Sequence, residues 1–233
     1  MNQLWVVVPA AGIGSRMLSE TPKQYLPLCN STVIENTLDV LLQIPDAQQA
    51  VVAIRNDDRW WPQTSTSKHP QVITTTGGDE RADSVMAALG HLLAMGVDRE
   101  SWVLVHDAAR PCVRLDDISA LIDSSLSHGD GGILALPVRD TMKLSDDESR
   151  IEKTVDRDHL WHALTPQMFR LGELHDAIQS AQEAGFPVTD EASAMEFSGF
   201  RPRLVEGKGD NIKITRPADL ALAEYFLMHR GDS

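Results

Sequence analysis

The stretch that most restricts the fold of this chain is a short apolar segment followed by a glycine-rich loop. Residues 4–8 (LWVVV) are apolar on both faces, as expected of a strand inside a parallel sheet. Residues 9–16 (PAAGIGSR) then contain two small residues and two glycines before an arginine. Such a loop turns tightly, and its successive backbone N–H groups can face one anion. Because Arg16 and Lys23 add positive charge, this stretch predicts a nucleoside triphosphate site.

Two other glycine loops do not fit this pattern. A dinucleotide-binding loop needs a third glycine and an acidic residue about twenty positions later. Here the third glycine is missing, and Asp39 falls within a helical pattern. The P-loop consensus G-x-x-x-x-G-K-[ST] does not occur in the chain. Taken alone, residues 12–16 also fit an ordinary tight turn, so the later motifs must decide.

Apolar runs and helical patterns alternate along most of the chain. Further strands are expected at 50–54, 71–74, 102–106, 131–137, 203–205 and 211–214. Helices are expected after the capping box at 32–35, from Asp57–Asp58, over 85–93, 116–129, 171–184 and 189–195, and from Pro217. The helix over 116–129 is expected to turn Leu121, Ile122 and Leu126 inward. This order predicts a three-layer α/β/α fold with a mostly parallel, Rossmann-like sheet, and we expect 1–233 to form a single domain.

The alternation breaks at residues 138–159. This segment is rich in β-branched and charged residues, with a polar turn around 145–149, and predicts a two-stranded hairpin. Isolated hairpins are marginal in water, so we expect a protruding β-arm that docks on a partner, with a disordered loop as the alternative.

Composition excludes several classes of protein. The net charge of −13 argues against nucleic-acid binding. No apolar run approaches the roughly eighteen residues of a membrane span, and the N-terminus has no signal-peptide pattern. Cys29 and Cys112 are the only cysteines, which argues against a disulfide framework and favours the cytoplasm. An acidic protein with phosphate substrates must gather its cations locally, and the cations in motif-like stretches are Arg16, Lys23, Arg81, Arg110, Arg157 and Lys213.

Three separate loops are expected to meet at one edge of the sheet. In an open parallel sheet, ligands lie beyond the carboxyl ends of the strands, which places the loops at 9–16, 77–84 and 107–111 together. Gly77 and Gly78 would let a base or phosphate approach the backbone, and Ser84 offers a hydroxyl at the start of a helix. An ordinary strand-to-helix turn explains the same residues equally well.

Asp107, at the tip of a strand, is a candidate ligand for Mg²⁺, and Asp210 is a second. A helix N-cap is an equal alternative for Asp107. His159 and His162 have a metal-like spacing but no completing ligands nearby, and His106 is expected to order the strand end.

Eight motifs together resemble one family over nearly the whole chain, the 2-C-methyl-D-erythritol 4-phosphate cytidylyltransferases of non-mevalonate isoprenoid biosynthesis. They are AAGxGxR at 10–16, PKQY at 22–25, GDERxxSV at 78–85, HDAARP at 106–111, VDR at 155–157, TPQ at 165–167, TDEA at 189–192 and DNIK at 210–213. The resemblance implies that a polyol phosphate attacks the α-phosphorus of CTP and that pyrophosphate leaves. It also implies Mg²⁺ as cofactor and a homodimer formed through the 138–159 arm.

The resemblance assigns roles to individual residues. The implied catalytic residues are Arg16, Lys23 and Asp107, and the implied metal ligands are Asp107 and Asp210. The implied nucleotide contacts are Ala10, Ala11, Gly12, Gly14, Gly78, Asp79, Ser84 and Ala108. The implied contacts to the polyol phosphate are Asp107, Arg110, Thr141, Arg157, Thr165 and Lys213.

Two other functions remain open on the sequence. A ribitol 5-phosphate cytidylyltransferase would share the loops and differ in the polyol pocket. A non-catalytic nucleotide-binding regulator on the same fold is possible because fold does not fix function. Intact Arg16, Lys23 and Asp107 argue against a regulator, since a sensor does not need to stabilise a transition state.

Overall fold

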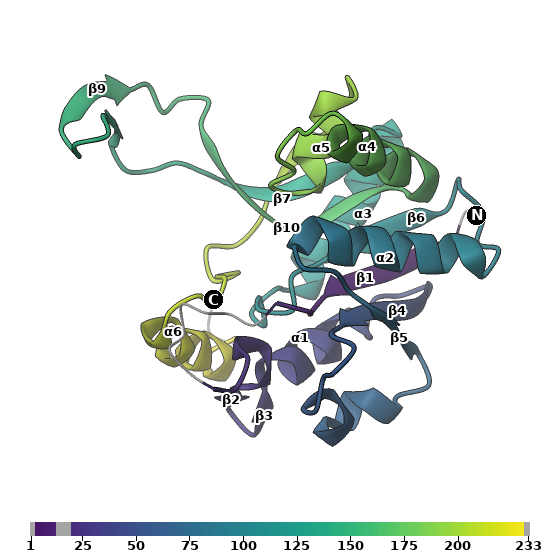
Figure 1. The fold of residues 1–233 in the computed structure, drawn as a ribbon. Coiled ribbons are helices and arrows are strands. Elements are labelled where there is room, and N and C mark those ends of the chain that lie inside the picture. Colours follow the sequence, from purple (N-terminus) through teal and green to yellow (C-terminus); the bar gives the residue numbers. More distant parts are fainter. Residues whose placement is uncertain (1–2, 13–19, 231–233) are drawn as a thin grey trace.

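A seven-stranded sheet forms the centre of the molecule (Figure 1). The structure is a computed structural model that describes residues 3–12 and 20–230. The strand order is β11-β7-β10-β6-β1-β4-β5. Among the described strands of this sheet, only β10 runs antiparallel to its neighbours, β6 and β7. The expected mostly parallel α/β sheet is therefore confirmed.

The elements have the following bounds. The strands are β1 (Leu4–Pro9), β2 (Pro27–Leu28), β3 (Ser31–Thr32), β4 (Ala47–Ile54), β5 (Val72–Thr76), β6 (Trp102–Val105), β7 (Gly132–Pro137), β8 (Met142–Ser145), β9 (Ile151–Val155), β10 (Trp161–Arg170) and β11 (Arg203–Glu206). The α-helices are α1 (Val33–Leu41), α2 (Arg81–Ala94), α3 (Leu115–His128), α4 (Leu171–Glu183), α5 (Glu191–Phe197) and α6 (Pro217–Met228). Short 3-10 helices lie at Lys23–Tyr25, Trp61–Gln63 and Ser65–Lys68.

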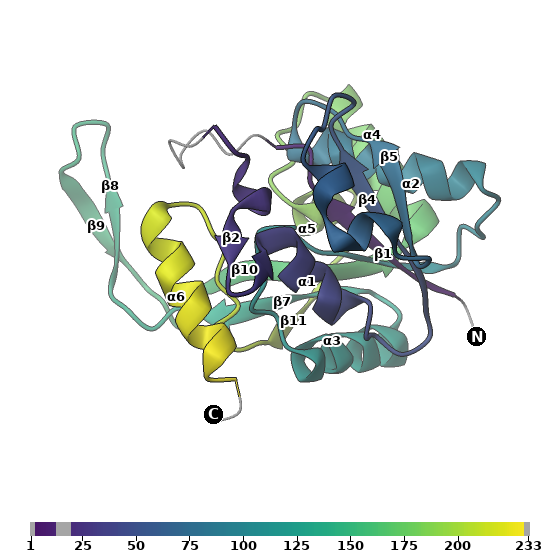
Figure 2. The same cartoon turned by 90° about the horizontal axis from the view of Figure 1, so that it is seen from below.

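Helices cover both faces of the sheet, which gives the three expected layers (Figure 2). Successive side chains of a strand point to opposite faces. In β1, Val6 therefore packs in the core with α1 and α3, whereas Val7 packs in the core with α2, α4 and α5. Both valines are almost fully buried. This double burial explains why β1 is apolar at every position.

Three local expectations were wrong or displaced, and one strand was missed. Strand β10 was not expected. Residues 211–214 form no strand, because their backbone turns toward the loop after β6, where Ile214 N–H donates to Ala109 O at 2.9 Å. The helix expected from Asp57 starts only at Trp61. In α3, Leu126 is 55% exposed rather than buried.

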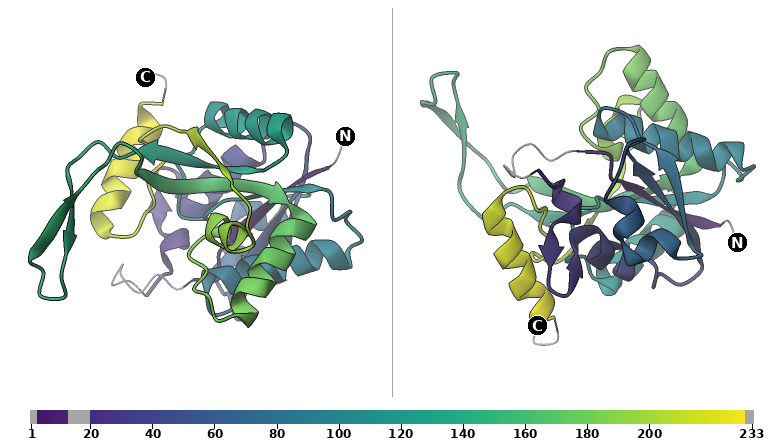
Figure 3. Two further views of the ribbon diagram at one scale, coloured as in Figure 1. Left: turned by 90° about the horizontal axis from the view of Figure 1, so that it is seen from above. Right: turned by 60° about the horizontal axis from the view of Figure 1, so that its bottom comes forward.

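The segment 138–159 forms the expected hairpin, with β8 and β9 paired antiparallel. We call residues 138–159 the arm. Its strands lie well away from the sheet (Figures 1 and 3). Two of its apolar side chains, Leu144 and Ile151, are 43% and 68% exposed. Among the described helices, none is long and apolar enough to cross a membrane.

Candidate active site

The three loops predicted to meet do lie together at the carboxyl ends of the parallel strands. They line a cavity of about 300 Å³, which we call the loop pocket. Its lining residues include Ala10, Ala11, Gly12, Lys23, Asp79, Ser84, Asp107, Ala108 and Lys213. Gly14 and Arg16 fall outside the described residues.

The loop after β1 is held by a side chain that sequence reasoning did not single out. The buried amide of Gln24 donates to Ala10 O at 2.7 Å and to Gly12 O at 3.0 Å. The neighbouring Lys23 donates from Nζ to Ile214 O at 3.0 Å. The 3-10 turn that carries both residues therefore fixes the start of the glycine loop and holds a cation at the pocket wall.

The two glycines before α2 are explained by packing. A Cβ on Gly77 would lie 2.7 Å from the Ala11 side chain, and one on Gly78 would lie 2.3 Å from Asp83 Cβ. Gly77 thus allows two loops to touch. Gly78 does not line the loop pocket formed by the described residues, whereas Asp79 does. The hydroxyl of Ser84, also in the wall, donates to Glu80 O at 3.2 Å.

Asp107 is the centre of a cluster of charged groups. Its carboxylate lies 2.7 Å from Arg81 Nε, 2.7 Å from Lys213 Nζ and 3.6 Å from Arg110 Nε. Burial alone would raise the pKa of Asp107, but the three cations outweigh burial and hold this pKa well below its usual range. The carboxylate is therefore ionised throughout the physiological range.

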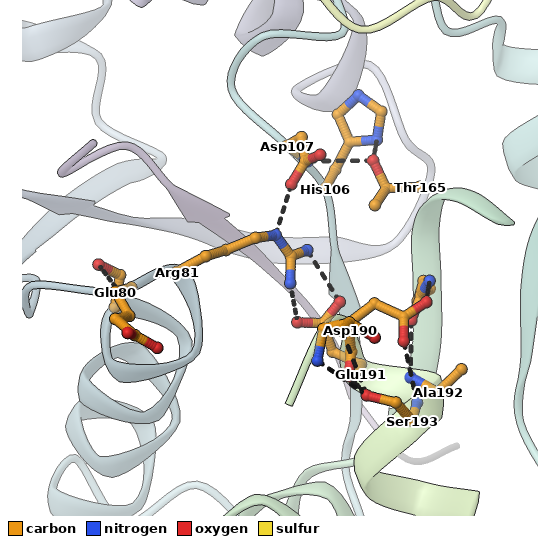
Figure 4. Close-up of polar contacts among 12 residues, drawn as sticks. Glu80, Arg81, His106, Asp107, Thr165, Asp190, Glu191, Ala192 and Ser193 are labelled. Carbon is orange, nitrogen blue, oxygen red and sulfur yellow. Dashed lines mark hydrogen bonds and ion pairs between the residues drawn. The ribbon is translucent and has the colours of Figure 1, made fainter. Parts of the chain in front are cut away.

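Arg81 is oriented from its far side by Glu191, the first residue of α5 (Figure 4). Arg81 Nη1 and Nη2 donate to the two Glu191 oxygens at 2.7 and 2.9 Å, while Arg81 Nε donates to Asp107. Glu191 is only 1% exposed. Two residues far apart in sequence thus fix one guanidinium in the wall, and no local pattern predicted that pairing.

A second cavity, of about 260 Å³, lies beside the first. We call it the strand pocket because β10 forms part of its wall. It is lined by Arg81, Asp107, Arg110, Ala163, Leu164, Thr165, Gln167, Thr189, Asp190 and Lys213. Arg81, Asp107 and Lys213 line both pockets, so the charged cluster stands where the two cavities meet.

Beneath this cluster, β6 and β10 are joined by side-chain hydrogen bonds. His106 is fully buried, and burial lowers its pKa to about 4. Its Nε2 lies 3.0 Å from Arg110 O, and its Nδ1 lies 3.1 Å from Thr165 Oγ1. Asp107 N–H donates to the same Thr165 hydroxyl at 3.1 Å. The expectation that His106 orders the strand end agrees with these contacts.

The two predicted metal ligands do not lie in one pocket. Asp210 accepts from Arg114 Nε at 2.7 Å and lines a different cavity with Arg114. Within residues 3–12 and 20–230, no three His, Cys, Asp or Glu side chains are grouped to hold a metal ion. Asp107 is the one predicted ligand that lines the two pockets, and its oxygens face Arg81 Nε and Lys213 Nζ, both at 2.7 Å. Mg²⁺ takes one or two carboxylates together with phosphate oxygens, so Asp107 is the residue left to hold it.

The two arm residues that are predicted to bind substrate also lie apart from the two pockets of their own chain. Thr141 and Arg157 are exposed, and neither lines the loop pocket or the strand pocket as the described residues form them. Arg157 donates to Arg139 O within the arm itself. Within one chain, the structure therefore brings Lys23, Asp107 and Lys213 together, with Arg110 and Thr165 beside them, but not the arm.

Comparisons with known proteins all lead to one enzyme family. The model of the family 2-C-methyl-D-erythritol 4-phosphate cytidylyltransferase matches residues 4–229. The chain is 51% identical to that enzyme of Vibrio vulnificus, over 100% of this chain and 98% of the relative, and 52% identical to that of Ectopseudomonas mendocina, over 94% of each. The solved structure of the Francisella tularensis enzyme is 38% identical with a TM-score of 0.84, covering 96% of this chain and 99% of that one.

Proposed function

Since the chain belongs to the 2-C-methyl-D-erythritol 4-phosphate cytidylyltransferase family, it is a nucleotidyltransferase of isoprenoid biosynthesis, and we propose that its two pockets divide the two substrates. The loop pocket takes CTP, and the strand pocket takes 2-C-methyl-D-erythritol 4-phosphate. The observation that carries this division is the set of residues common to both cavities, Arg81, Asp107 and Lys213. Reacting phosphates must meet at such a junction.

The reaction needs positioning and charge neutralisation more than covalent help. An oxygen of the acceptor phosphate attacks the α-phosphorus of CTP, the bond from that phosphorus to the bridging oxygen breaks, and pyrophosphate leaves. Lys23 reaches the loop pocket and would neutralise charge on the α-phosphate, together with Arg16. The acceptor phosphate is largely ionised at neutral pH, so no side chain has to remove a proton.

Mg²⁺ belongs to the same proposal. When bound, it would neutralise triphosphate charge, with Asp107 as its protein ligand. Asp79 and Ser84, in the wall of the loop pocket, would face the base and ribose, and Ala10, Ala11, Gly12 and Ala108, in the same wall, would line the phosphates. For Gly14 and Gly78, the proposed nucleotide contacts rest on the family resemblance alone. Asp210 is not included, because it lines another cavity.

A pyrophosphate-release assay tests the function. We expect release from CTP only when 2-C-methyl-D-erythritol 4-phosphate and Mg²⁺ are both present, with ribitol 5-phosphate as the competing acceptor. Equal turnover with ribitol 5-phosphate would favour the alternative cytidylyltransferase. Nucleotide binding without release from either acceptor would favour a regulator. Equal turnover with ATP, or full activity in excess chelator, would contradict the nucleotide and metal assignments.

The arm supports a shared site in a homodimer. Thr141 and Arg157 lie in the arm, away from both pockets of their own chain, and we assign them to the strand pocket of a second copy. A mixture of Lys23→Ala and Arg157→Ala proteins tests this assignment. In a mixed dimer, one site carries both defects and the other carries neither, so random exchange restores about a quarter of all sites. No recovery after verified subunit exchange would argue against the shared site.

The expectations of no nucleic-acid partner and of a cytoplasmic setting rest on the composition of the chain. The chain has a net charge of −13, which argues against a nucleic-acid partner. Cys29 and Cys112 are both free thiols, in keeping with the proposed cytoplasmic setting.

A further inference from the structure

One peptide group in the wall of the loop pocket is held in its orientation from outside the pocket. It joins Ala108 to Ala109, in the loop that follows β6. We propose that Thr37, in helix α1, is a positioning residue that turns this peptide so that Ala109 N–H faces the loop pocket and donates to a phosphate oxygen of the nucleotide. This inference rests on the proposed function, since that function assigns the nucleotide to the loop pocket.

The peptide in question is the middle one of a tight turn. Arg110 N–H donates to Asp107 O at 3.1 Å, which closes a turn over residues 107–110. The middle peptide of such a turn can point in two opposite directions, and this difference separates type I from type II turns. Type II needs a positive φ at the third residue, a position that glycine usually occupies. Ala109 stands there without a positive φ, so its backbone excludes type II.

The carbonyl group of this peptide is bound from the side of α1. Thr37 has no exposed surface, and its Oγ1 donates to Ala108 O at 2.9 Å. The same hydroxyl lies 3.0 Å from Val33 O, but that carbonyl already accepts a backbone N–H within the helix. In the described part of the chain, Ala108 O has no other donor. The Thr37 hydroxyl is therefore what satisfies this carbonyl and holds it toward α1.

The direction of the carbonyl also fixes the direction of the next N–H group. A trans peptide carries its C=O and N–H on opposite sides, so Ala109 N–H points away from α1. Of the described residues that line the loop pocket, none belongs to α1, whereas Ala108 and Ala109 are both among them. Both alanines are only 4% exposed, and their N–H groups have no acceptor within residues 3–12 and 20–230. Buried N–H groups are nearly always paired, so these two call for a ligand in the pocket.

The surroundings of Ala109 N–H favour a phosphate oxygen as its acceptor. Lys23 and Lys213 line the same pocket and bring two positive charges to it. Neighbouring backbone N–H groups beside cations form an anion site, because every donor there attracts the same negative charge. The triphosphate is the part of CTP that carries negative charge. The N–H that Thr37 directs into the pocket therefore binds the triphosphate more strongly than the base or the ribose.

A pair of substitutions at Thr37 tests the positioning role. Thr37→Val keeps the branched shape of the side chain and removes its hydroxyl. Ala108 O then loses its donor and turns toward water in the pocket, which takes Ala109 N–H out of line. We expect the dissociation constant for CTP to rise about 10- to 100-fold, the effect of one hydrogen bond to a charged group. Thr37→Ser keeps the hydroxyl and should bind CTP as the wild type does.

A second buried threonine separates this role from a loss of stability. Thr64 is 6% exposed, and its Oγ1 donates to Trp61 O at 2.8 Å, but neither residue lines the loop pocket or the strand pocket as the described residues form them. Thr64→Val loses a comparable hydrogen bond, so it should lower the midpoint of thermal unfolding about as much as Thr37→Val does, with unchanged CTP affinity. Unchanged CTP affinity in Thr37→Val, or an equal loss of affinity in the two valine variants, would overturn the proposal.

The amide group of Ala109 can also be observed directly, which decides the matter even if Thr37→Val does not fold. In the full-length wild type labelled with ¹⁵N-alanine, CTP and Mg²⁺ without an acceptor should move the Ala109 amide proton downfield, as a hydrogen bond to a phosphate oxygen does. Ala109→Ser identifies the resonance. If the Ala10 and Ala11 resonances respond to CTP and that of Ala109 does not, the inference is wrong and the nucleotide assignment stands. If no alanine resonance responds, CTP does not bind, and the proposed function fails as well.

Discussion

Glu191→Ala should destabilise the protein by about 3 kcal/mol, although Glu191 lies in neither pocket lining. Glu191 is 1% exposed and binds Arg81 through two hydrogen bonds of 2.7 and 2.9 Å. Removing one partner of a buried ion pair leaves the other charge uncompensated, which costs roughly 3–5 kcal/mol. Arg81 is 25% exposed and keeps its bond to Asp107, so we expect the lower end of that range.

A second arginine–carboxylate pair provides the control. Arg99 and Asp176 are just as close, at 2.6 Å, but their side chains are 51% and 62% exposed. Exposed pairs contribute about 0.2–1 kcal/mol, so Asp176→Ala should fall within that range. Glu191→Gln keeps the shape of the side chain and removes only its charge, so it should lie between the two alanine variants.

Denaturant unfolding at pH 7 measures all three variants. The difference should appear as a shift of the midpoint at constant slope, which is the signature of a change in stability alone. Equal losses of unfolding free energy in Glu191→Ala and Asp176→Ala, or losses below about 1 kcal/mol in both, would refute the reasoning. Burial of the Arg81–Glu191 pair would then not determine how much the pair stabilises the protein. The same Glu191→Ala protein should also lose activity, because Arg81 loses the partner that orients it toward Asp107.

Three further predictions concern single residues. Lys23→Ala should lower kcat about 10²- to 10³-fold in steady-state assays, with a smaller rise in KM for CTP; an unchanged kcat with weakened CTP binding would assign Lys23 to the ground state. Gly77→Ala should lower the free energy of unfolding by about 1–3 kcal/mol, because the new Cβ would lie 2.7 Å from the Ala11 side chain. In α2, a Cβ on Gly90 would meet nothing within 4 Å, so Gly90→Ala should raise the free energy of unfolding by up to about 1 kcal/mol. Equal effects of the two substitutions would refute the packing argument. Burial would raise the pKa of Glu35, but hydrogen bonds from Thr32 and Ser65 lower it to about 2. The Glu35 carboxylate therefore stabilises the fold fully above about pH 4.5, and this stabilisation is lost as the pH falls toward 2. The difference in unfolding free energy between the wild type and Glu35→Gln should narrow over that range, and a constant difference would contradict the assignment.

The parallel part of the fold could be predicted because its signals are local. Apolar strands and the Thr32–Glu35 capping box are visible in the sequence, and both are present. Strand β10 was missed because Pro166 lies inside it, and proline normally argues against a central strand. The structure accommodates this proline where the register of β10 with β7 shifts, between Ala163 and Gln167.

The site could be predicted only in part, for a related reason. Parallel strands bring the loops after them to one edge, so the meeting of residues 9–12, 77–84 and 107–109 follows from the order of elements. The contacts of individual side chains do not follow from that order. Glu191 and Arg81 are 110 positions apart, and nothing in either segment indicates that they pair. Gly14 and Arg16 lie outside the described residues, so their predicted roles remain predictions.

Because β10 runs antiparallel to β7, the two ends of the arm lie side by side, and the arm can be replaced without moving the sheet. β7 ends and β10 begins at the same edge of the sheet, where Pro137 pairs with Trp161 and Val138 N–H donates to Leu160 O at 2.9 Å. The two ends of the excursion are therefore already neighbours, at a separation that a tight turn of about two residues can close. Shortening, lengthening or grafting the arm would leave the strand register and both pockets in place. Changes to the arm can therefore alter what Thr141 and Arg157 reach without altering the fold of the two pockets in their own chain.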